Sequence, residues 1–405
     1  MSVPPEHPPA YVPFARTVFA LCVVGLFVVA QLYTVLPVLG SLAASWSTTA
    51  ASAGWTATAF GFGYAAGFLF SGPLSDRFGR RRLIINGLLL TALATAAVAA
   101  APNLPVGCAL RTLQGLCAAS FAPPAFSYIA GHIAPARRVT AMTWLTSSFL
   151  AAGVLGQVFA QLLVETGGWR AVFLVSAALL ACGAVVLHYV LAEDTAAAVS
   201  SAREAYRAMG RLLAAPALLL LLVTTLTLLC SFVTLYTALQ LSGPVSVTNN
   251  PDMLLALRAS SLPAMLCVPL VTTWLVRLTA VHRIATALLT AALVALLTAL
   301  FASGGTNIFL LSGLLFLFVF GIAVTAPALV EAIGALAGTA RGAAVALYTF
   351  ALFVGASMGP QLAAALPGGF AGAALGAAVL LVGGAGCAVG SIRGGRSSPT
   401  TADGL

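Results

Sequence analysis

Charged residues are scarce in this sequence. Only 7% of its 405 residues are charged, while 61% are hydrophobic, and a soluble domain carries about 25% charged residues. Lysine is absent, so all 18 basic residues are arginine. The composition therefore excludes an ordinary soluble protein and predicts an integral membrane protein. In such a protein the positions of the arginines matter more than the net charge of +9, and we expect no nucleic-acid partner.

Cysteine pairs and catalytic clusters are absent as well. The seven cysteines all fall inside apolar runs and none forms a C-x-x-C pair, which argues against a disulfide framework or a metal site. The sequence contains no His/Cys/Asp cluster, no nucleophile constellation and no phosphate-binding glycine loop. We therefore expect no enzyme activity, no metal and no cofactor.

The charge-free stretches are long enough to be counted as membrane-spanning helices, each of which needs about 20 apolar residues. Residues 17–75 hold two spans around a polar turn near Trp46. One span each is predicted in residues 83–110, 112–136, 139–164, 171–192, 212–251 and 259–276. Residues 284–330 hold two more, broken at 303–307, and residues 342–392 another two, broken at 367–369. The sequence thus predicts an all-α membrane protein with twelve transmembrane helices.

The arginines orient these helices. With an even number of spans both termini lie on one side, and placing them inside puts fifteen of the eighteen arginines in the cytoplasm. Arg170 and Arg258 then fall near the outer face, and Arg111 lies within a span. Because basic residues accumulate in cytoplasmic loops, we predict a multi-pass protein of the bacterial inner (plasma) membrane with cytoplasmic N- and C-termini.

A charged segment at residues 192–213 separates six predicted helices from six. We expect a disordered tail at 1–13, a first six-helix bundle at 14–191, a linker at 192–213, a second six-helix bundle at 214–392 and a disordered tail at 393–405. Arg203, Arg207 and Arg211 share one face of an amphipathic helix in the linker. This spacing favours contact with anionic membrane lipids, and a solvated linker helix is the alternative.

The densest charge cluster, GPLSDRFGRRR at residues 72–82, lies between the second and third predicted helices. It resembles the G-x-x-x-D-R-x-G-R-R loop of the major facilitator superfamily, and the matching residues are Gly72, Asp76, Arg77, Gly79, Arg80 and Arg81. The two glycines permit tight turns and close helix approach. A carboxylate such as Asp76 suits the positive end of a helix, and the resemblance implies the helix that begins near residue 341. We therefore expect a gating motif, since a simple positively charged stop would leave the aspartate and both glycines unexplained.

Other segments narrow the resemblance to one branch. LRTLQG at residues 110–115 resembles the R-x-x-Q-G motif of the drug:proton antiporters. QLYTVLPVLGSL (31–42), GWR (168–170) and CSFVTLYTALQ (230–240) look like the arabinose-efflux-permease-like exporters. The fifth predicted helix departs from the antiporter pattern G-x-x-x-G-P-x-x-G-G, because Gln157 stands in the place of the proline. The resemblance implies the major facilitator fold, in which two six-helix bundles enclose a substrate site between them.

Polar and aromatic side chains inside the predicted spans would be costly facing lipid, so we expect them to line a substrate cavity; packing in the protein core is the alternative. The candidates are Gln31, Tyr33, Arg111, Gln114, Gln157, Thr234, Tyr236 and Gln240. Arg111 matters most, because an arginine in a span costs roughly 2.5–3.5 kcal/mol on insertion. We expect a net-positive cavity that prefers neutral or anionic amphiphiles, with Arg111 as the anchor. In the competing interpretation Arg111 only braces two helices of the first bundle.

The resemblance implies a secondary active transporter that works as a monomer and exports small amphiphilic molecules by alternating access, as multidrug exporters do. A major-facilitator importer (a solute:proton symporter or a facilitator) is the alternative, and a membrane sensor without transport is the third. Exchange for protons rests on the resemblance alone, because none of the nine acidic residues lies in the middle of a span. Glu331, near the cytoplasmic end of the tenth predicted helix, comes closest to a proton carrier.

Overall fold

The computed structural model of the chain describes residues 11–193, 202–264, 267, 277–302 and 307–396. These residues form helices joined by short turns, and no strand occurs among them. Within the described ranges, seven helices are long and apolar enough to cross a membrane. The expected all-helical membrane protein is therefore confirmed.

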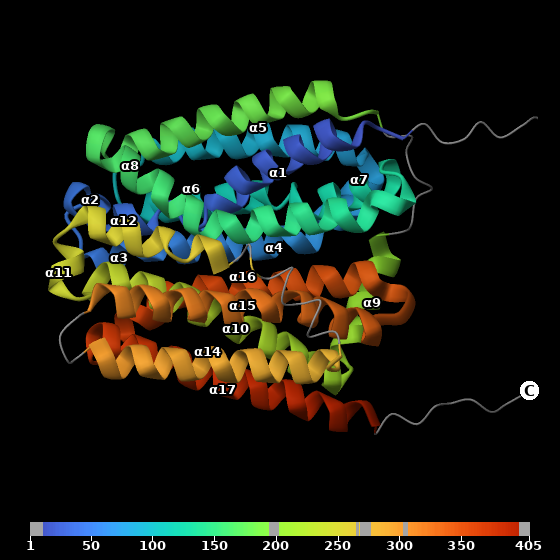
Figure 1. Cartoon of the computed structure of the whole chain (residues 1–405). Coiled ribbons are helices and arrows are strands. Elements are labelled where there is room, and N and C mark those ends of the chain that lie inside the picture. The colour runs from blue at the N-terminus through green and yellow to red at the C-terminus, as the bar shows by residue number, and fades with distance from the viewer. Residues whose placement is uncertain (1–10, 194–201, 265–266, 268–276, 303–306, 397–405) are drawn as a thin grey trace, which may run out of the picture.

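The first half of the chain forms one group of helices, the upper layer in Figure 1. This first helix group comprises α1 (Phe14–Ala30), η1 (Leu36–Val38), α2 (Leu39–Ser45), α3 (Ala50–Ala53), α4 (Trp55–Phe78), α5 (Arg80–Ala99), α6 (Leu104–Ala118), α7 (Ala122–His132) and α8 (Pro135–Val190). α8 contains two helices joined at Gly168, where a φ of 69° bends the chain. α1 and α5 pack against α8, and α4 and α5 pack against α6.

The second half of the chain forms the lower layer in Figure 1. After the connecting helix α9 (Ala202–Leu213), this second helix group comprises α10 (Pro216–Ser242), α11 (Val245–Thr248), α12 (Pro251–Ala259), α14 (Ala280–Ala302), α15 (Ile308–Ala337), η2 (Gly338–Ala340), α16 (Arg341–Ala365) and α17 (Gly369–Arg396). α10 packs against α16 and α17, and α14 packs against α15 and α17. α17 continues to Arg396, beyond the predicted start of the C-terminal tail at residue 393.

Turn-forming residues end the later helices where the sequence predicts breaks. α14 ends at Ala302 and α15 begins at Ile308, on either side of the break predicted at residues 303–307. Asn307 starts α15, because its side-chain oxygen accepts from the backbone N–H groups of Phe309 and Leu310 at 3.0 and 3.3 Å, as an N-cap does. The break predicted at 367–369 agrees equally well with the end of α16 and the start of α17.

Two predicted spans are interrupted where the sequence is apolar. The first span ends as α1 at Ala30, and residues 31–35 form a turn before η1. The span predicted at 112–136 is divided between α6 and α7, and Pro123 and Pro124, which lack an N–H donor, lie in the first turn of α7. Such breaks free backbone carbonyl groups inside the protein, and these groups then need other partners.

The two ends of the molecule differ in composition. The start of α1, the α4–α5 junction and the end of α17 lie at one end, on the right in Figure 1, which we call the arginine end because it carries residues 77–82. α2, α3, α11 and α12 lie at the other end, which we call the far end. We use these two names below to say at which end of the molecule the two helix groups contact each other.

The two glycines of the residue 72–82 motif have different environments. Gly79 separates α4 from α5 with φ 86° and ψ 142°, a backbone conformation that essentially only glycine adopts. Gly72 is helical, and a Cβ atom added to it would meet no atom within 4 Å. The backbone at Gly79 thus forms the kind of turn that glycine permits, whereas the described residues leave open space next to Gly72.

These environments predict opposite effects of the same substitution. Gly79→Ala should destabilise the protein by about 1–3 kcal/mol, the typical cost of a strained backbone position. Gly72→Ala should be neutral or stabilise by roughly 0.5–1 kcal/mol, because alanine is favoured over glycine inside a helix. Thermal unfolding of the purified variants in detergent measures both effects. A Gly72→Ala variant as unstable as Gly79→Ala would contradict this account.

Candidate functional site

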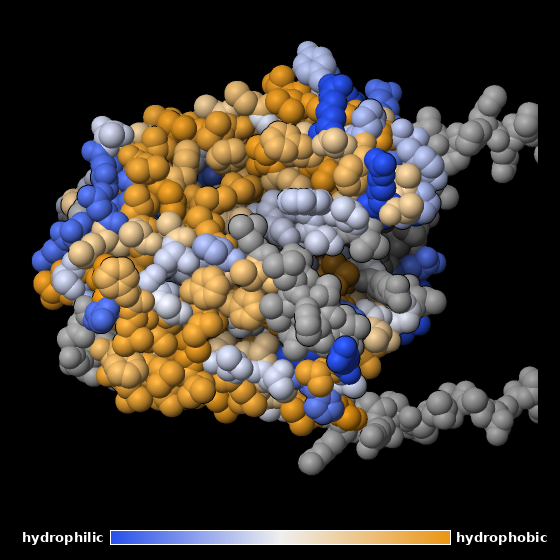
Figure 2. All heavy atoms as spheres, viewed as in Figure 1, coloured by the Kyte–Doolittle hydropathy of each residue, from blue (hydrophilic) through white to orange (hydrophobic). Residues whose placement is uncertain are grey.

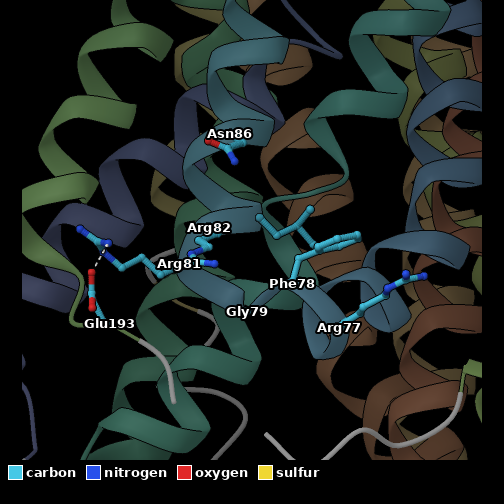
Figure 3. Close-up of a pocket in the computed structure, with 8 residues that line it drawn as sticks. Arg77, Phe78, Gly79, Arg81, Arg82, Asn86 and Glu193 are labelled. Carbon is cyan, nitrogen blue, oxygen red and sulfur yellow. Dashed lines mark ion pairs between the residues drawn. The ribbon is translucent and has the colours of Figure 1, made fainter. Parts of the chain in front are cut away.

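Three arginines of the residue 72–82 motif, Arg77, Arg81 and Arg82, line a cavity of about 460 Å³ at the arginine end. Arg81 is held there by contacts with the end of α8 and the residues after it, since its Nη2 donates to the carbonyl of His188 at 2.7 Å and its Nη1 lies 3.6 Å from Glu193. Figure 3 shows Arg81 and Glu193 pointing toward each other, while Arg77 lies on the opposite side of the junction. The other lining residues include Phe78, Gly79, Arg82 and Asn86. Arg81 thus ties the α4–α5 junction to the end of α8.

The expected cap between Asp76 and the helix that begins near residue 341 stays a prediction. That helix is α16, which begins at Arg341 and packs against α4. The side chains of Asp76 and Arg341 lie outside the part of the chain that the structure describes. The packing of α4 on α16 is consistent with the proposed partner helix and leaves the contact itself untested.

Arg111 lies at the centre of a buried hydrogen-bond network inside the first helix group. Its side chain is 0% exposed. Nη2 donates to the carbonyl of Gln31 at 2.8 Å, Nε donates to the carbonyl of Thr56 at 3.2 Å, and Nη1 donates to Gln114 Oε1 at 2.6 Å. Gln114 in turn donates to Gln31 Oε1 at 3.2 Å and to Thr95 Oγ1 at 2.7 Å. The network joins the turn after α1 to α4, α5 and α6.

Aromatic rings complete the surroundings of Arg111. Its guanidinium carbon lies 4.4 Å from the ring centre of Phe60 on α4 and 5.7 Å from that of Phe173 on α8, both within the range of a cation–π contact. All the partners of Arg111 that the structure describes belong to the first helix group. The geometry therefore favours the bracing interpretation of Arg111 over its interpretation as the substrate anchor.

Three aromatic rings meet where the two helix groups come together. Tyr33, in the turn after α1, lies edge-on to Phe232 on α10 with 6.0 Å between ring centres. Phe232 stacks on Tyr236, one turn further along α10, at 4.7 Å. Gly153 on α8 lies next to two of these rings, since a Cβ atom there would be in van der Waals contact with Phe232 at 3.5 Å and Tyr33 at 3.6 Å. Tyr33 and Tyr236, both predicted, are thus brought close to one aromatic cluster.

Thr234 does not join this cluster. Its hydroxyl group donates to the carbonyl of Gly359 on α16 at 3.3 Å, so it faces another helix of its own group. Residues two apart on a helix point in different directions, which explains why Thr234 and Tyr236 separate although both are buried. The predicted cavity lining is thus divided between the aromatic cluster and the packing of the second group.

One face of α8 presents polar side chains to the second helix group. Gln157 and Gln161 follow Gly153 at intervals of four residues, which places all three on the same side of the helix. Gln157 Nε2 donates to the Gly153 carbonyl at 2.7 Å, and its Oε1 is buried without a hydrogen-bond partner among the described residues. Gln161 Oε1 accepts from Arg258 Nη1 at 3.0 Å. The predicted residue Gln157 thus lies between the aromatic cluster and Arg258.

Arg258, in the last turn of α12, is a residue that the sequence analysis missed. It was expected near the outer face, yet it is 0% exposed. Its Nη2 donates to Oε1 of Gln240, one of the predicted lining residues, and its Nη1 crosses to Gln161 on α8. The signal that could have revealed it is that Arg258 directly precedes the apolar stretch predicted as a span at residues 259–276.

Contacts between α4 and α16 close the same end of the molecule. Thr58, near the start of α4, donates to the carbonyl of Ser357 at 2.7 Å and accepts from Gln361 Nε2 at 3.1 Å. Gly61 lies directly against Ser357. Phe68, further along α4, still packs on Phe353 with 5.4 Å between ring centres. These side-chain contacts occupy the far end and the middle of α4. Closer to the arginine end, a Cβ atom at Gly72 would meet no described atom within 4 Å.

Glu331, the predicted proton carrier, lies on α15 and forms an ion pair with Arg283 on α14. The side chain of Glu331 is 59% exposed, while that of Arg283 is 10% exposed. The acid thus lies at the protein surface and holds the buried guanidinium of a neighbouring helix. Its environment differs from the buried carboxylate that a proton carrier was expected to need.

The hydrophobicity of the outer surface agrees with a membrane location. In Figure 2 apolar side chains cover most of the visible face between the two ends, and hydrophilic ones gather at those ends. Large apolar side chains from both helix groups are exposed, among them Phe19, Leu93, Leu293 and Val379. A continuous exposed apolar surface of this kind is typical of contact with lipid.

Comparisons with known proteins agree with this architecture. A family model described as Major Facilitator Superfamily matches residues 21–360. The chain is 38% identical over 162 residues to the uncharacterized transporter YgaY of Escherichia coli O157:H7, which covers 39% of this chain and 40% of the relative. It is 34% identical over 139 residues to the niacin transporter NiaP of Acinetobacter baylyi, covering 34% and 31% respectively.

A third relative has a name of a different kind. The chain is 30% identical over 175 residues to the multidrug resistance protein B homolog of Mycobacterium tuberculosis, which covers 43% of this chain and 32% of the relative. Each of these matches spans two fifths or less of the length of the relative. The relatives therefore support a broad class of protein, and their individual substrates do not transfer directly.

The Arg111 network predicts a stability effect. Arg111→Gln should leave Gln114 Oε1 without the donor it has in this structure. The Gln31 carbonyl would keep the Thr34 hydroxyl as a donor at 3.3 Å, and the Thr56 carbonyl lies within helix α4. A buried unsatisfied polar group costs about 1–3 kcal/mol. We expect a loss of about 1–3 kcal/mol, seen as a lower midpoint of thermal unfolding in detergent. Arg111→Lys should be intermediate, because an ammonium group lacks the planar fork of a guanidinium.

Arg170→Gln provides the matched control for Arg111. Arg170 is exposed and stacks on Trp169, so its replacement should change stability by no more than about 0.5 kcal/mol. If Arg111→Gln unfolds like this control and instead binds substrate more weakly, the anchor interpretation is correct and the bracing interpretation fails.

Proposed function

The chain belongs to the Major Facilitator Superfamily and is a transporter, not an enzyme; we propose that it exports small amphiphilic molecules from the cell by alternating access. The observation that carries this proposal is the buried polar and aromatic cluster at the contact of the two helix groups, near Tyr33, Gln157 and Tyr236. Substrate sites of such transporters lie at the interface between repeated halves. Each helix group corresponds to one six-helix bundle in this proposal, which gives twelve spans.

The distribution of contacts supports alternating access. The helix groups are joined at the far end by Arg258 with Gln161 and by Thr58 with Ser357, while Gly72 near the arginine end is open. We assign this structure to the state that is closed at the far end. Transport then requires these hydrogen bonds to break and the region around Gly72 to close, which gives that glycine a role in the second state.

The orientation of the protein in the bacterial inner membrane follows from the arginines. The described starts and ends of the two helix groups lie at the arginine end, and an excess of basic residues marks the cytoplasmic side. Arg207 and Arg211 on α9 are exposed while Met209 between them is buried, which supports contact of α9 with anionic lipid headgroups. Arg203 also belongs to the predicted face, and its side chain lies outside the described residues.

Import is a second candidate. One relative is named a niacin transporter and another a multidrug resistance protein homolog, and niacin is a small aromatic carboxylate. Membrane vesicles distinguish the two directions, since an exporter loads inside-out vesicles and an importer loads right-side-out vesicles under an imposed gradient. We expect substrates from a panel of amphiphilic compounds to accumulate in inside-out vesicles. Accumulation in right-side-out vesicles alone would replace export by import.

The motif at residues 72–82 provides a test of gating. If Asp76 caps the start of α16 when the arginine end closes, Asp76→Asn should lower the transport rate several-fold, because the neutral side chain loses its attraction to the helix N-terminus. The amount of protein in the membrane should not change. Asp252→Asn, an exposed acid at the start of α12, is the control. An Asp76→Asn variant that transports substrate at the normal rate would contradict the gating role of Asp76.

Proton coupling through Glu331 is a further proposal of this function. In vesicles with an imposed pH gradient, Glu331→Gln should abolish accumulation against the substrate gradient and preserve equilibration down it. Glu204→Gln, which removes an exposed acid on α9, is the control. A Glu331→Gln variant that still accumulates substrate under the pH gradient excludes this residue as the carrier and leaves its ion pair with Arg283 as a structural contact.

A further inference from the structure

Arg258 is a buried cation whose partners in this structure are neutral. Its guanidinium donates to two amide oxygens, those of Gln161 and Gln240, and no ion pair joins it to a carboxylate within the described residues. Buried charges in proteins are normally paired with an opposite charge. The chemistry at Arg258 is therefore complementary to an anion that the chain itself does not supply.

The hydrogen-bond network of Arg258 reaches a carboxylate, that of Glu165, only through the amide group of Gln161. Gln161 Nε2 donates to Glu165 Oε1 at 3.0 Å, while its Oε1 accepts from Arg258 at 3.0 Å. Glu165 is exposed, whereas Gln161 is buried. The Gln161 amide therefore occupies the position at Arg258 that a counter-ion would take, and it does so from the opposite helix group.

Two buried polar atoms near this contact have no partner among the described residues. Nε of Arg258 is a donor without an acceptor, and Oε1 of Gln157 is an acceptor without a donor. Gln157 lies one turn from Gln161 and one turn from Gly153 on the same face of α8, and Gly153 lies next to the rings of Phe232 and Tyr33. The unpaired acceptor of Gln157 thus lies on the α8 face that contacts Arg258 through Gln161 and the rings through Gly153.

We propose that Arg258 binds the carboxylate of a small aromatic acid when the helix groups separate at the far end and Gln161 withdraws. Withdrawal of Gln161 frees Nη1–H, and Nη1–H and the second Nη2–H of the guanidinium lie side by side and match the two oxygens of a carboxylate. The rings of Tyr33 and Phe232 pack against the aromatic body of the ligand, and Gln157 Oε1 accepts from a ring hydroxyl. Gln240, on the same helix group as Arg258, keeps its hydrogen bond throughout.

This inference rests on the proposed transport function and narrows its substrates. The probes are 4-hydroxybenzoate and its uncharged counterpart 4-hydroxybenzamide, measured by equilibrium binding to the purified full-length protein in lipid nanodiscs. We expect the acid to bind at least tenfold more tightly than the amide. Arg258→Gln should remove this preference, and Arg170→Gln, which removes an exposed charge at the same end, should retain it. Equal affinity for the two probes, or an Arg258→Gln variant that keeps the preference, overturns the proposal.

A second variant tests the site without removing the arginine. Gln161→Glu places a carboxylate within reach of Arg258 and so supplies the missing anion from the chain. We expect it to weaken binding of 4-hydroxybenzoate about tenfold or more, to leave 4-hydroxybenzamide unchanged and to raise the midpoint of thermal unfolding. A purely structural Arg258 would gain stability with no change in the preference between probes. This variant also decides the question if Arg258→Gln does not fold.

Vesicle transport separates failure of this inference from failure of the proposed function. If the protein transports neutral amphiphiles and neither binds nor transports 4-hydroxybenzoate, the inference is wrong and the transporter stands. If no compound of the panel moves across the membrane, the proposed transport function is wrong. If the protein in nanodiscs still prefers 4-hydroxybenzoate in that case, Arg258 belongs to a ligand-binding site in a protein that does not transport.

Discussion

A backbone carbonyl freed by a helix break determines how the first helix group is held together. α1 ends at Ala30, so the Gln31 carbonyl leaves the helical hydrogen-bond pattern inside a protein that lipid surrounds, where water cannot replace the lost partner. Arg111 donates to this carbonyl and, with Gln114, connects it to Thr56 and Thr95. One charged side chain thus stabilises a break in one helix and fixes its distance from three others. The aromatic cluster at the contact of the helix groups depends on the same break, because Tyr33 lies in the turn that follows it.

The positions of most helices could be predicted from charged residues and turn-forming residues. The breaks inside two apolar runs could not. The breaks at residues 303–307 and 367–369 contain glycine, proline or asparagine between long apolar runs, and the helices end there. The turn at residues 31–35 lies in a stretch without charge, so counting charge-free runs extends the helix through it. The proline pair at Pro123 and Pro124 did carry a signal, since proline removes a backbone donor, but an apolar run of the right length concealed it. Length and hydrophobicity define how many residues can cross a membrane and do not define where a helix bends within it.

The sequence analysis identified which polar residues are buried better than it identified which of them contact one another. Gln31, Arg111 and Gln114 are buried and hydrogen-bonded together, as polar groups in lipid must be, although their roles depend on partners 80 or more residues apart in the chain. Arg258 was overlooked because it was placed near the outer face with Arg170, and that placement fails where amides from other helices can accept from a buried arginine. Tertiary packing decides which of the two buried arginines lies at the contact between the helix groups. No pattern in a single sequence predicts that contact.

The different partners of the two arginines have different consequences for motion. All acceptors of Arg111 lie in the first helix group, so this network can move as a rigid unit while the groups rotate. Arg258 has one acceptor in each group, so rotation at the far end must exchange one of them. A hydrogen bond to a charged group contributes about 1.5–3 kcal/mol, and a free energy of this size shifts an equilibrium between two states by roughly 10- to 150-fold. A free energy of this size is large enough to favour the state that is closed at the far end. It is also small enough for a bound ligand, which supplies a new acceptor to Arg258, to shift the equilibrium toward the open state. Arg258 can therefore both close the site and respond to the binding of a ligand.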